Sequence, residues 1–185
     1  MLFDIGTGIL LSLWVSKFFH IALTSSLIML GIFFVLAPDF DFLVELFRHG
    51  SVGGREIREH RQISHFPLTY IPVIAVILVL RGPLWASFIG LAILAHFAHD
   101  SAGIGWGIKW MWPFSNKWYK CFSEKNGDFS PRLLISWSPE ELTNVAAAYA
   151  HPDWFRFIYL RAHPINIIES AWFAVSLCVL YFFTH

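Results

Sequence analysis

Long apolar stretches alternate with short polar breaks along most of the chain. Five stretches stand out, and each predicts a helix: Ile5 to Val15, Ile21 to Ala37, Phe66 to Leu80, Leu84 to Phe97 and Ile165 to Phe183. A helix that crosses a bilayer needs about 20 apolar residues. The last stretch comes near that length and the second approaches it. The shorter three predict helices that are buried in a membrane protein or reach only part of the way across.

The breaks between these stretches predict the topology. Arg81-Gly82-Pro83 is a tight turn signal, and Lys17 to His20 is a weaker one. If successive helices run up and down, the two long connections, Pro38 to His65 and Asp100 to Pro164, fall on the same side. Most lysines and arginines lie in these connections. The positive-inside rule therefore predicts that this side is cytoplasmic.

Composition supports a membrane protein. Hydrophobic residues make up 56% of the chain and charged residues 14%, whereas soluble domains have about 45–50% and about 25%. This composition disfavours a soluble globular protein and excludes a disordered chain. We expect an all-α integral membrane bundle of about five apolar helices with short interfacial helices, forming one membrane-embedded domain over residues 1–185. The first residues lack the positive region of a cleavable signal peptide.

Charge and cysteine content narrow the function further. The 13 basic residues balance the 13 acidic residues, so we expect no nucleic-acid partner held by a broad basic face. Cys121 and Cys178 lie far apart in the sequence. They predict neither a disulfide framework nor a cysteine metal motif.

Metal-ligand side chains collect at the helix ends on the predicted cytoplasmic side. The candidates are Asp4, Asp39, Asp41, His60, His65, His96, His99 and Asp100. His96 and Asp100 are four residues apart and share a helix face. Asp39 and Asp41 alternate, so an extended or capping segment would point both the same way. His60 and His65 are expected to straddle the junction before the helix that Pro67 begins.

Imidazole and carboxylate ligands together suit zinc, manganese or iron, and two or more ions suit a phosphoester displacement. Each residue could also have a purely structural role. Asp39 could cap a short helix after Pro38, His96 could be a buried core histidine, and Asp100 could lie beyond the helix end at the interface. Arg55 to Glu59 resembles a solvated helix face. Ionisable groups in a membrane are costly and usually functional, so three such groups on one side favour a metal site.

Residues 100–164 predict an interfacial segment that faces the cytoplasm. Trp106, Trp118 and Trp137 are among its six tryptophans, which occur with lysines and are typical of a membrane-interface belt. Ser138-Pro139-Glu140-Glu141 predicts a capped helix start, with the helix running to about Tyr149. The segment could be a lid over the site or a structural layer.

Four motifs occur in order: Pro38-Asp39-x-Asp41, His60-Arg61-x-x-Ser64-His65, His96-x-x-x-Asp100 and Trp112-Pro113-Phe114. Over roughly the first two thirds of the chain this pattern resembles the YdjM-type family of inner-membrane proteins, which are described as metal-dependent hydrolases. That family is thought to be distantly related to zinc-dependent phospholipase C and single-strand nucleases. The chain departs from the family in having Asp4 where many relatives have a histidine, and in having Gln62 and Ser64 where the family has Gly and Thr.

The resemblance implies hydrolysis of a phosphoester at the cytoplasmic face of a bacterial-type inner membrane, through metal-activated water. Zinc, or another divalent metal such as manganese, is the expected cofactor, with two or more ions. Asp39, Arg61 and His65 are the expected catalytic residues, and Arg61 would neutralise a phosphate oxygen or pair with a nearby glutamate. A site at headgroup level suggests a lipid-like substrate in the bilayer. The alternatives are a metal-binding or transport protein, which ligands on both sides of the midplane would favour, and a non-catalytic membrane scaffold.

Overall fold

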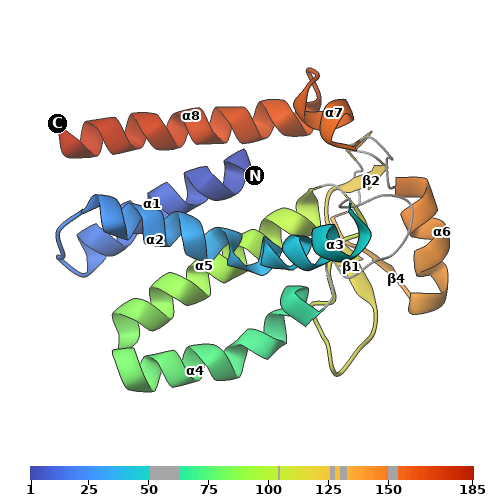
Figure 1. Ribbon diagram of the computed structural model, residues 1–185, viewed down its shortest axis with the longest axis horizontal. Coiled ribbons are helices and arrows are strands. Elements are labelled where there is room, and N and C mark those ends of the chain that lie inside the picture. Colours follow the sequence, from blue (N-terminus) through green and yellow to red (C-terminus); the bar gives the residue numbers. More distant parts are fainter. Residues whose placement is uncertain (51–62, 104, 126–127, 130–132, 150–153) are drawn as a thin grey trace. The chain divides into compact units, whose positions relative to one another are not determined.

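The computed structural model describes residues 1–50, 63–103, 105–125, 128–129, 133–149 and 154–185, and it is mostly helical (Figure 1). The helices are α1 (Leu2–Phe18), α2 (Ser25–Leu36), α3 (Asp41–His49), α4 (Tyr70–Arg81), α5 (Pro83–Ala102), α6 (Pro139–Tyr149), α7 (Trp154–Tyr159) and α8 (Pro164–Thr184). Short 3-10 turns span Ala37–Phe40, Ile63–His65 and Pro67–Thr69.

Two helices among the described residues are long and apolar enough to cross a membrane, Ser25–Arg48 and Pro164–Thr184. The first runs beyond the predicted stretch, because the 3-10 turn over Ala37–Phe40 joins α2 to α3 without a break. Pro38 is tolerated there because the tight turn does not need its missing N–H. The shorter apolar helix Pro67–Arg81 does not reach spanning length. The mostly helical architecture is as predicted, whereas the count of about five apolar helices stays a prediction.

Two predicted helix boundaries agree with the structure. α4 ends at Arg81, Gly82 has a φ of 83°, and α5 begins at Pro83. Glycine adopts a positive φ more readily than other residues, so the structure has the turn at Arg81-Gly82-Pro83 that the sequence predicted. At the start of α6, the backbone N–H of Ser138 donates to Oε2 of Glu141 at 2.8 Å, which is the return bond of a capping box.

Short strands correct the expectation of an entirely α-helical chain. β1 (Trp118–Lys120) pairs antiparallel with β4 (Ile135–Trp137), and β2 (Ser123–Lys125) pairs with β3 (Asp128–Phe129). In the first pair, Trp118 lies opposite Trp137. Strands of two or three residues are too short for an alternating pattern to be recognised. Their formation depends on pairing between distant segments.

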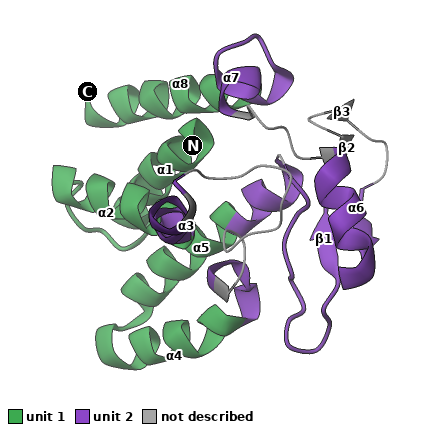
Figure 2. Ribbon diagram, turned by 45° about the vertical axis from the view of Figure 1, so that its right-hand side comes forward, with its two compact units in different colours: residues 1–38, 69–96, 168–185 green, residues 39–68, 97–167 purple. Residues whose placement is uncertain are grey.

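The chain divides into two compact units, coloured separately in Figure 2. Unit 1 contains residues 1–38, 69–96 and 168–185, and unit 2 contains residues 39–68 and 97–167. Helix α5 contributes to both, because the division falls within it after His96.

Within unit 1, α1 and α2 approach closely through small residues. A Cβ added to Gly8 would lie 2.6 Å from the Cα and N atoms of Ile32, so only glycine fits. The hydroxyl of Ser12 lies 2.8 Å from the carbonyl oxygen of Gly8 and 3.0 Å from that of Leu27 on α2. Small residues and hydroxyl bonds of this kind are typical of helix pairs in membranes.

Helix α8 packs on α1 through two polar contacts. The indole N–H of Trp172 donates to the hydroxyl of Thr7 at 3.0 Å. The carboxylate of Glu169 accepts from the backbone N–H of Leu2 at 3.2 Å. Glu169 is buried, and a carboxylate at a helix N-terminus meets unpaired N–H groups and the positive end of the helix dipole. The first turn of α1 is therefore held by α8.

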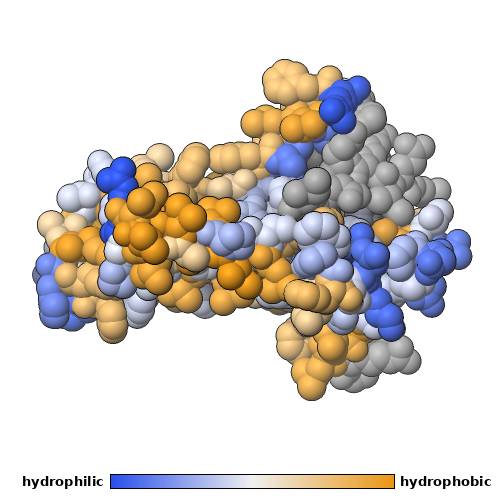
Figure 3. All heavy atoms as spheres, turned by 90° about the horizontal axis from the view of Figure 1, so that it is seen from below, coloured by the Kyte–Doolittle hydropathy of each residue, from blue (hydrophilic) through white to orange (hydrophobic). Residues whose placement is uncertain are grey.

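Unit 1 exposes a large apolar surface. α4 faces the viewer in Figure 3, where hydrophobic side chains cover it. Val79 is 83% exposed and Leu80 is 73% exposed. Soluble monomers rarely expose contiguous apolar patches of this kind, and a lipid environment accounts for this one.

Unit 2 has its own aromatic core. Trp106, Trp118 and Trp137 pack with Leu142 and Ala146 of α6, and the indole N–H of Trp137 donates to the carbonyl oxygen of Trp106 at 2.8 Å. These three tryptophans are buried, so they do not form the interfacial belt that the sequence predicted. Tryptophan density alone does not distinguish a belt from a small core, because the indole suits both.

Candidate metal centre

Three segments supply five of the candidate ligands. Asp39 lies in the 3-10 turn Ala37–Phe40, and Asp41 begins α3. His65 ends the turn Ile63–His65. His96 and Asp100 lie one turn apart on α5, so helix geometry places them on one face.

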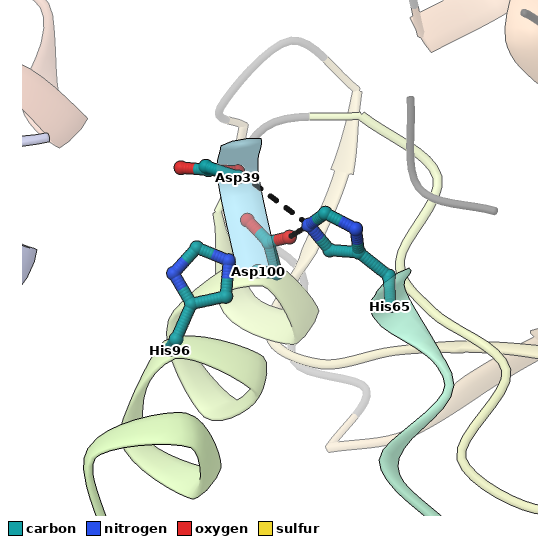
Figure 4. Close-up of side chains that lie close together, drawn as sticks. All are labelled: Asp39, His65, His96 and Asp100. Carbon is teal, nitrogen blue, oxygen red and sulfur yellow. Dashed lines mark ion pairs between the residues drawn. The ribbon is translucent and has the colours of Figure 1, made fainter. Parts of the chain in front are cut away.

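Four of these side chains form a cluster that could hold a metal ion. Asp39, His65, His96 and Asp100 each offer one ligand atom, and the four atoms all lie within 4.8 Å of one another (Figure 4). Nε2 of His65 is 3.5 Å from Oδ1 of Asp39 and 3.2 Å from Oδ2 of Asp100. The His65 side chain is fully buried, whereas that of Asp39 is 28% exposed. The cluster is therefore enclosed, with Asp39 on its more open side.

Asp41 meets the opposite side of the His65 ring. Its Oδ2 atom lies 3.2 Å from Nδ1 of His65 and 2.5 Å from the hydroxyl of Ser64, which donates to it. The sequence suggested that Asp39 and Asp41 point the same way. They instead reach different ring nitrogens, because the segment is helical, and residues two apart on a helix are about 200° apart around its axis.

The carboxylates around His65 favour a positive charge within this cluster. Burial lowers the pKa of His65, but hydrogen bonds with Asp100, Asp39 and Asp41 raise it by more, to about 11. Buried carboxylates are stable only when a positive charge compensates them. A protonated His65 would supply that charge, and so would a divalent cation held by two carboxylates and two imidazoles. This donor set suits zinc or manganese.

Asp4 and His99 lie outside the four-residue group. Asp4 is 1% exposed, and its Oδ1 atom lies 3.4 Å from Nδ1 of His96. His99 lies on α5 between His96 and Asp100. The backbone carbonyl oxygen of His99 accepts a hydrogen bond from the backbone N–H of Gly103 at 2.7 Å.

The model of the YdjM inner membrane protein family matches residues 4–185, which is nearly the full chain. The chain belongs to the YdjM inner membrane protein family. The match confirms the resemblance that the motifs indicated and extends it through α8. No curated protein and no solved structure matches the chain. Membership in an inner membrane family agrees with the two candidate spans and with the exposed apolar surface of α4.

Some predicted site residues of this YdjM-family chain are not among those described. His60 and Arg61 lie outside the described residues, as does the segment from Arg55 to Glu59. Their assigned roles stay predictions.

One charged residue of unit 2 was not singled out by the sequence. The ammonium of Lys109 lies 5.5 Å from the ring centroid of Phe66 and 5.2 Å from that of Trp118. Phe66 directly follows His65 in the chain. Burial lowers the pKa of Lys109. No local sequence pattern indicates a role for Lys109, because the two rings that it contacts, those of Phe66 and Trp118, come from separate segments.

Proposed function

We propose that this chain is a membrane-bound metal-dependent hydrolase that acts on a phosphoester at the cytoplasmic face of the inner membrane. The observation that carries the proposal is the buried cluster of Asp39, His65, His96 and Asp100. A cluster of two carboxylates and two imidazoles at this spacing requires a compensating positive charge, and it has the donor atoms of a zinc or manganese site.

The ligand residues have separate tasks in this proposal. A divalent ion held by the cluster would lower the pKa of a coordinated water toward about 7 and polarise a phosphoryl oxygen. Asp39 is the more exposed ligand, so it is suited to accept a proton from an incoming water. His65 is fully buried, so its task is to hold the site. Arg61 is proposed to neutralise a phosphate oxygen.

A lipid-like substrate is favoured by the surroundings of Asp39 and Asp41. The helix that follows them, α3, carries exposed apolar side chains, with Phe47 at 85% and Val44 at 46% exposure. Apolar side chains beside a polar site suit a substrate that has a phosphoester head and an acyl tail. The family's place in the inner membrane supports the same substrate class.

Elemental analysis of the detergent-purified full chain tests the proposal. The wild type is compared with the double variant His96→Ala/Asp100→Ala and with His99→Ala, a matched control on the same helix outside the cluster. We expect zinc or manganese in the wild type and in His99→Ala, and none in the double variant. The same preparations are then assayed with phospholipids and soluble phosphoesters, and the metal-to-chain ratio tests the expectation of two or more ions.

Each other outcome has a defined meaning. Bound metal without hydrolysis of any phosphoester would refute the enzyme and favour a metal-binding or transport protein. Wild-type protein that takes up no metal after reconstitution would refute the metal centre and favour a scaffold.

A further inference from the structure

His96 contacts a carboxylate on the side of its ring that faces away from the cluster. Its Nδ1 atom lies 3.4 Å from Oδ1 of Asp4, and Figure 4 shows its other ring nitrogen turned toward Asp100. His96 and Asp4 are each 1% exposed. A buried imidazole is thus placed between a carboxylate from α1 and the cluster.

The same arrangement occurs at the second imidazole of the cluster. His65 directs Nε2 toward Asp39 and Asp100, and its Nδ1 atom lies 3.2 Å from Asp41. A metal-ligating histidine usually donates its other ring N–H to a carboxylate, which fixes the tautomer and the ring orientation and makes the ligating nitrogen more basic. Both histidines therefore have a carboxylate oxygen within 3.4 Å of the ring nitrogen that faces away from the cluster.

We infer that Asp4 is a positioning residue, which orients His96 as a ligand through Nδ1 and does not bind the metal itself. The inference rests on the proposed metal centre and assigns a task to the residue that departs from the family's usual histidine. Asp4 lies outside the four residues whose ligand atoms come within 4.8 Å of one another. Its contact is to the nitrogen of His96 that points away from them.

Helix α8 fixes Asp4 in turn. The amino group of Met1 lies 3.1 Å from Oδ2 of Asp4 and 3.0 Å from Oε2 of Glu169, and Glu169 also accepts from the backbone N–H of Leu2. The two oxygens of Asp4 thus have different neighbours, Met1 and His96. Rotation of the carboxylate would break both contacts, so the group is held in one orientation.

Cobalt(II) binding to the full chain in detergent tests the inference without an activity assay. Affinity is measured by competition with a chromophoric chelator, and the visible ligand-field bands report which groups coordinate the ion. The variants are Asp4→Asn, Asp100→Asn as the loss of a proposed ligand, and Thr7→Val as a structural control. Thr7 lies one turn after Asp4 on α1 and bonds Trp172 of α8.

We expect Asp4→Asn to weaken cobalt binding about 10–100-fold while its bands and its metal-to-chain ratio stay those of the wild type. Asp100→Asn should change the bands. Thr7→Val should lower stability and leave the affinity unchanged. Glu169→Gln is a second variant, which loosens Asp4 without touching His96, and it should weaken binding less than Asp4→Asn with the bands retained.

Four results would overturn the inference. Altered ligand-field bands in Asp4→Asn would make Asp4 a ligand. An unchanged cobalt affinity in Asp4→Asn would mean that Asp4 does not position His96. An equal loss of affinity in Thr7→Val would mean that Asp4 acts only through the stability of α1. Wild-type protein that binds no cobalt would overturn the inference together with the metal centre. Cobalt binding without phosphoester hydrolysis would overturn the proposed enzyme alone.

Discussion

The close contact of α1 with α2 predicts a large cost for one added methyl group. In Gly8→Ala, the new Cβ would lie 2.6 Å from two backbone atoms of Ile32 and 2.8 Å from the carbonyl carbon of Gly31. Backbone atoms cannot rotate away as a side chain does. The helices must therefore separate until the contact reaches the ordinary 3.4 Å, a movement of about 0.8 Å from 2.6 Å.

The magnitude follows from this separation. A gap of about 0.5–1 Å removes roughly a quarter to a half of each dispersion contact across an interface, and overpacking typically costs about 1–3 kcal/mol. The bond from Ser12 to the carbonyl of Leu27, now 3.0 Å, would be stretched beyond hydrogen-bond length, which costs about 1 kcal/mol more. Alanine returns about 1 kcal/mol through its higher helix propensity. The net destabilisation is expected to be about 1–3 kcal/mol.

Gly90→Ala is the matched control. A Cβ at Gly90 of α5 would meet only the side chain of Ile74, at 3.7–4.0 Å, which is ordinary contact. The propensity gain therefore remains, and we expect stabilisation by up to about 1 kcal/mol. Both variants are unfolded at equilibrium by SDS in mixed micelles and followed by helical circular dichroism. If Gly8→Ala unfolds at the same SDS fraction as Gly90→Ala, the close approach of α1 and α2 is refuted.

Three further predictions concern the site and its orientation. Asp41→Asn should weaken zinc affinity about 10–100-fold in a chelator competition, because it removes the carboxylate beside Nδ1 of the ligating His65 imidazole. Ser64→Ala should cause a smaller loss. Equal zinc affinities in the wild type and both variants would contradict the role of Asp41 in orienting His65. Lys109→Met keeps the packing on the two rings but removes the charge, and it should raise KM for an anionic phosphoester about ten-fold with a smaller effect on kcat; an unchanged KM would exclude an ammonium contact with the substrate. In a Cys178→Ser background, a membrane-impermeant thiol reagent should label Cys121 in inverted vesicles and not in right-side-out vesicles, and the reverse pattern would mean that the site faces outward.

The helices were predictable because local sequence determines them. The apolar run over residues 165–183 and the turn at Arg81-Gly82-Pro83 are physical signals that act within a few residues. α3 was expected only in the alternative in which Asp39 caps a short helix after Pro38. Residues 41–49 are amphipathic, and a proline usually interrupts an apolar helix. The structure instead continues through a 3-10 turn.

The small sheet was not predictable for a different reason. β1 and β4 are three residues each, and their pairing buries Trp118 and Trp137 together in a core with α6. That burial exists only after two separate segments meet. The same tryptophans and lysines, considered by composition, suited a membrane interface equally well.

The residues of the candidate centre were found from their chemistry, but their separate tasks depend on backbone geometry. The motif spacing predicted equivalent roles for the carboxylates of Asp39 and Asp41. Because their segment is helical, one reaches Nε2 of His65 and the other reaches Nδ1, so one lies on the cluster side of the ring and the other behind it. Asp4 lies beside Nδ1 of His96, as Asp41 lies beside Nδ1 of His65. Which nitrogen a carboxylate faces therefore distinguishes a proposed ligand from a residue that supports one, and sequence spacing does not contain that information.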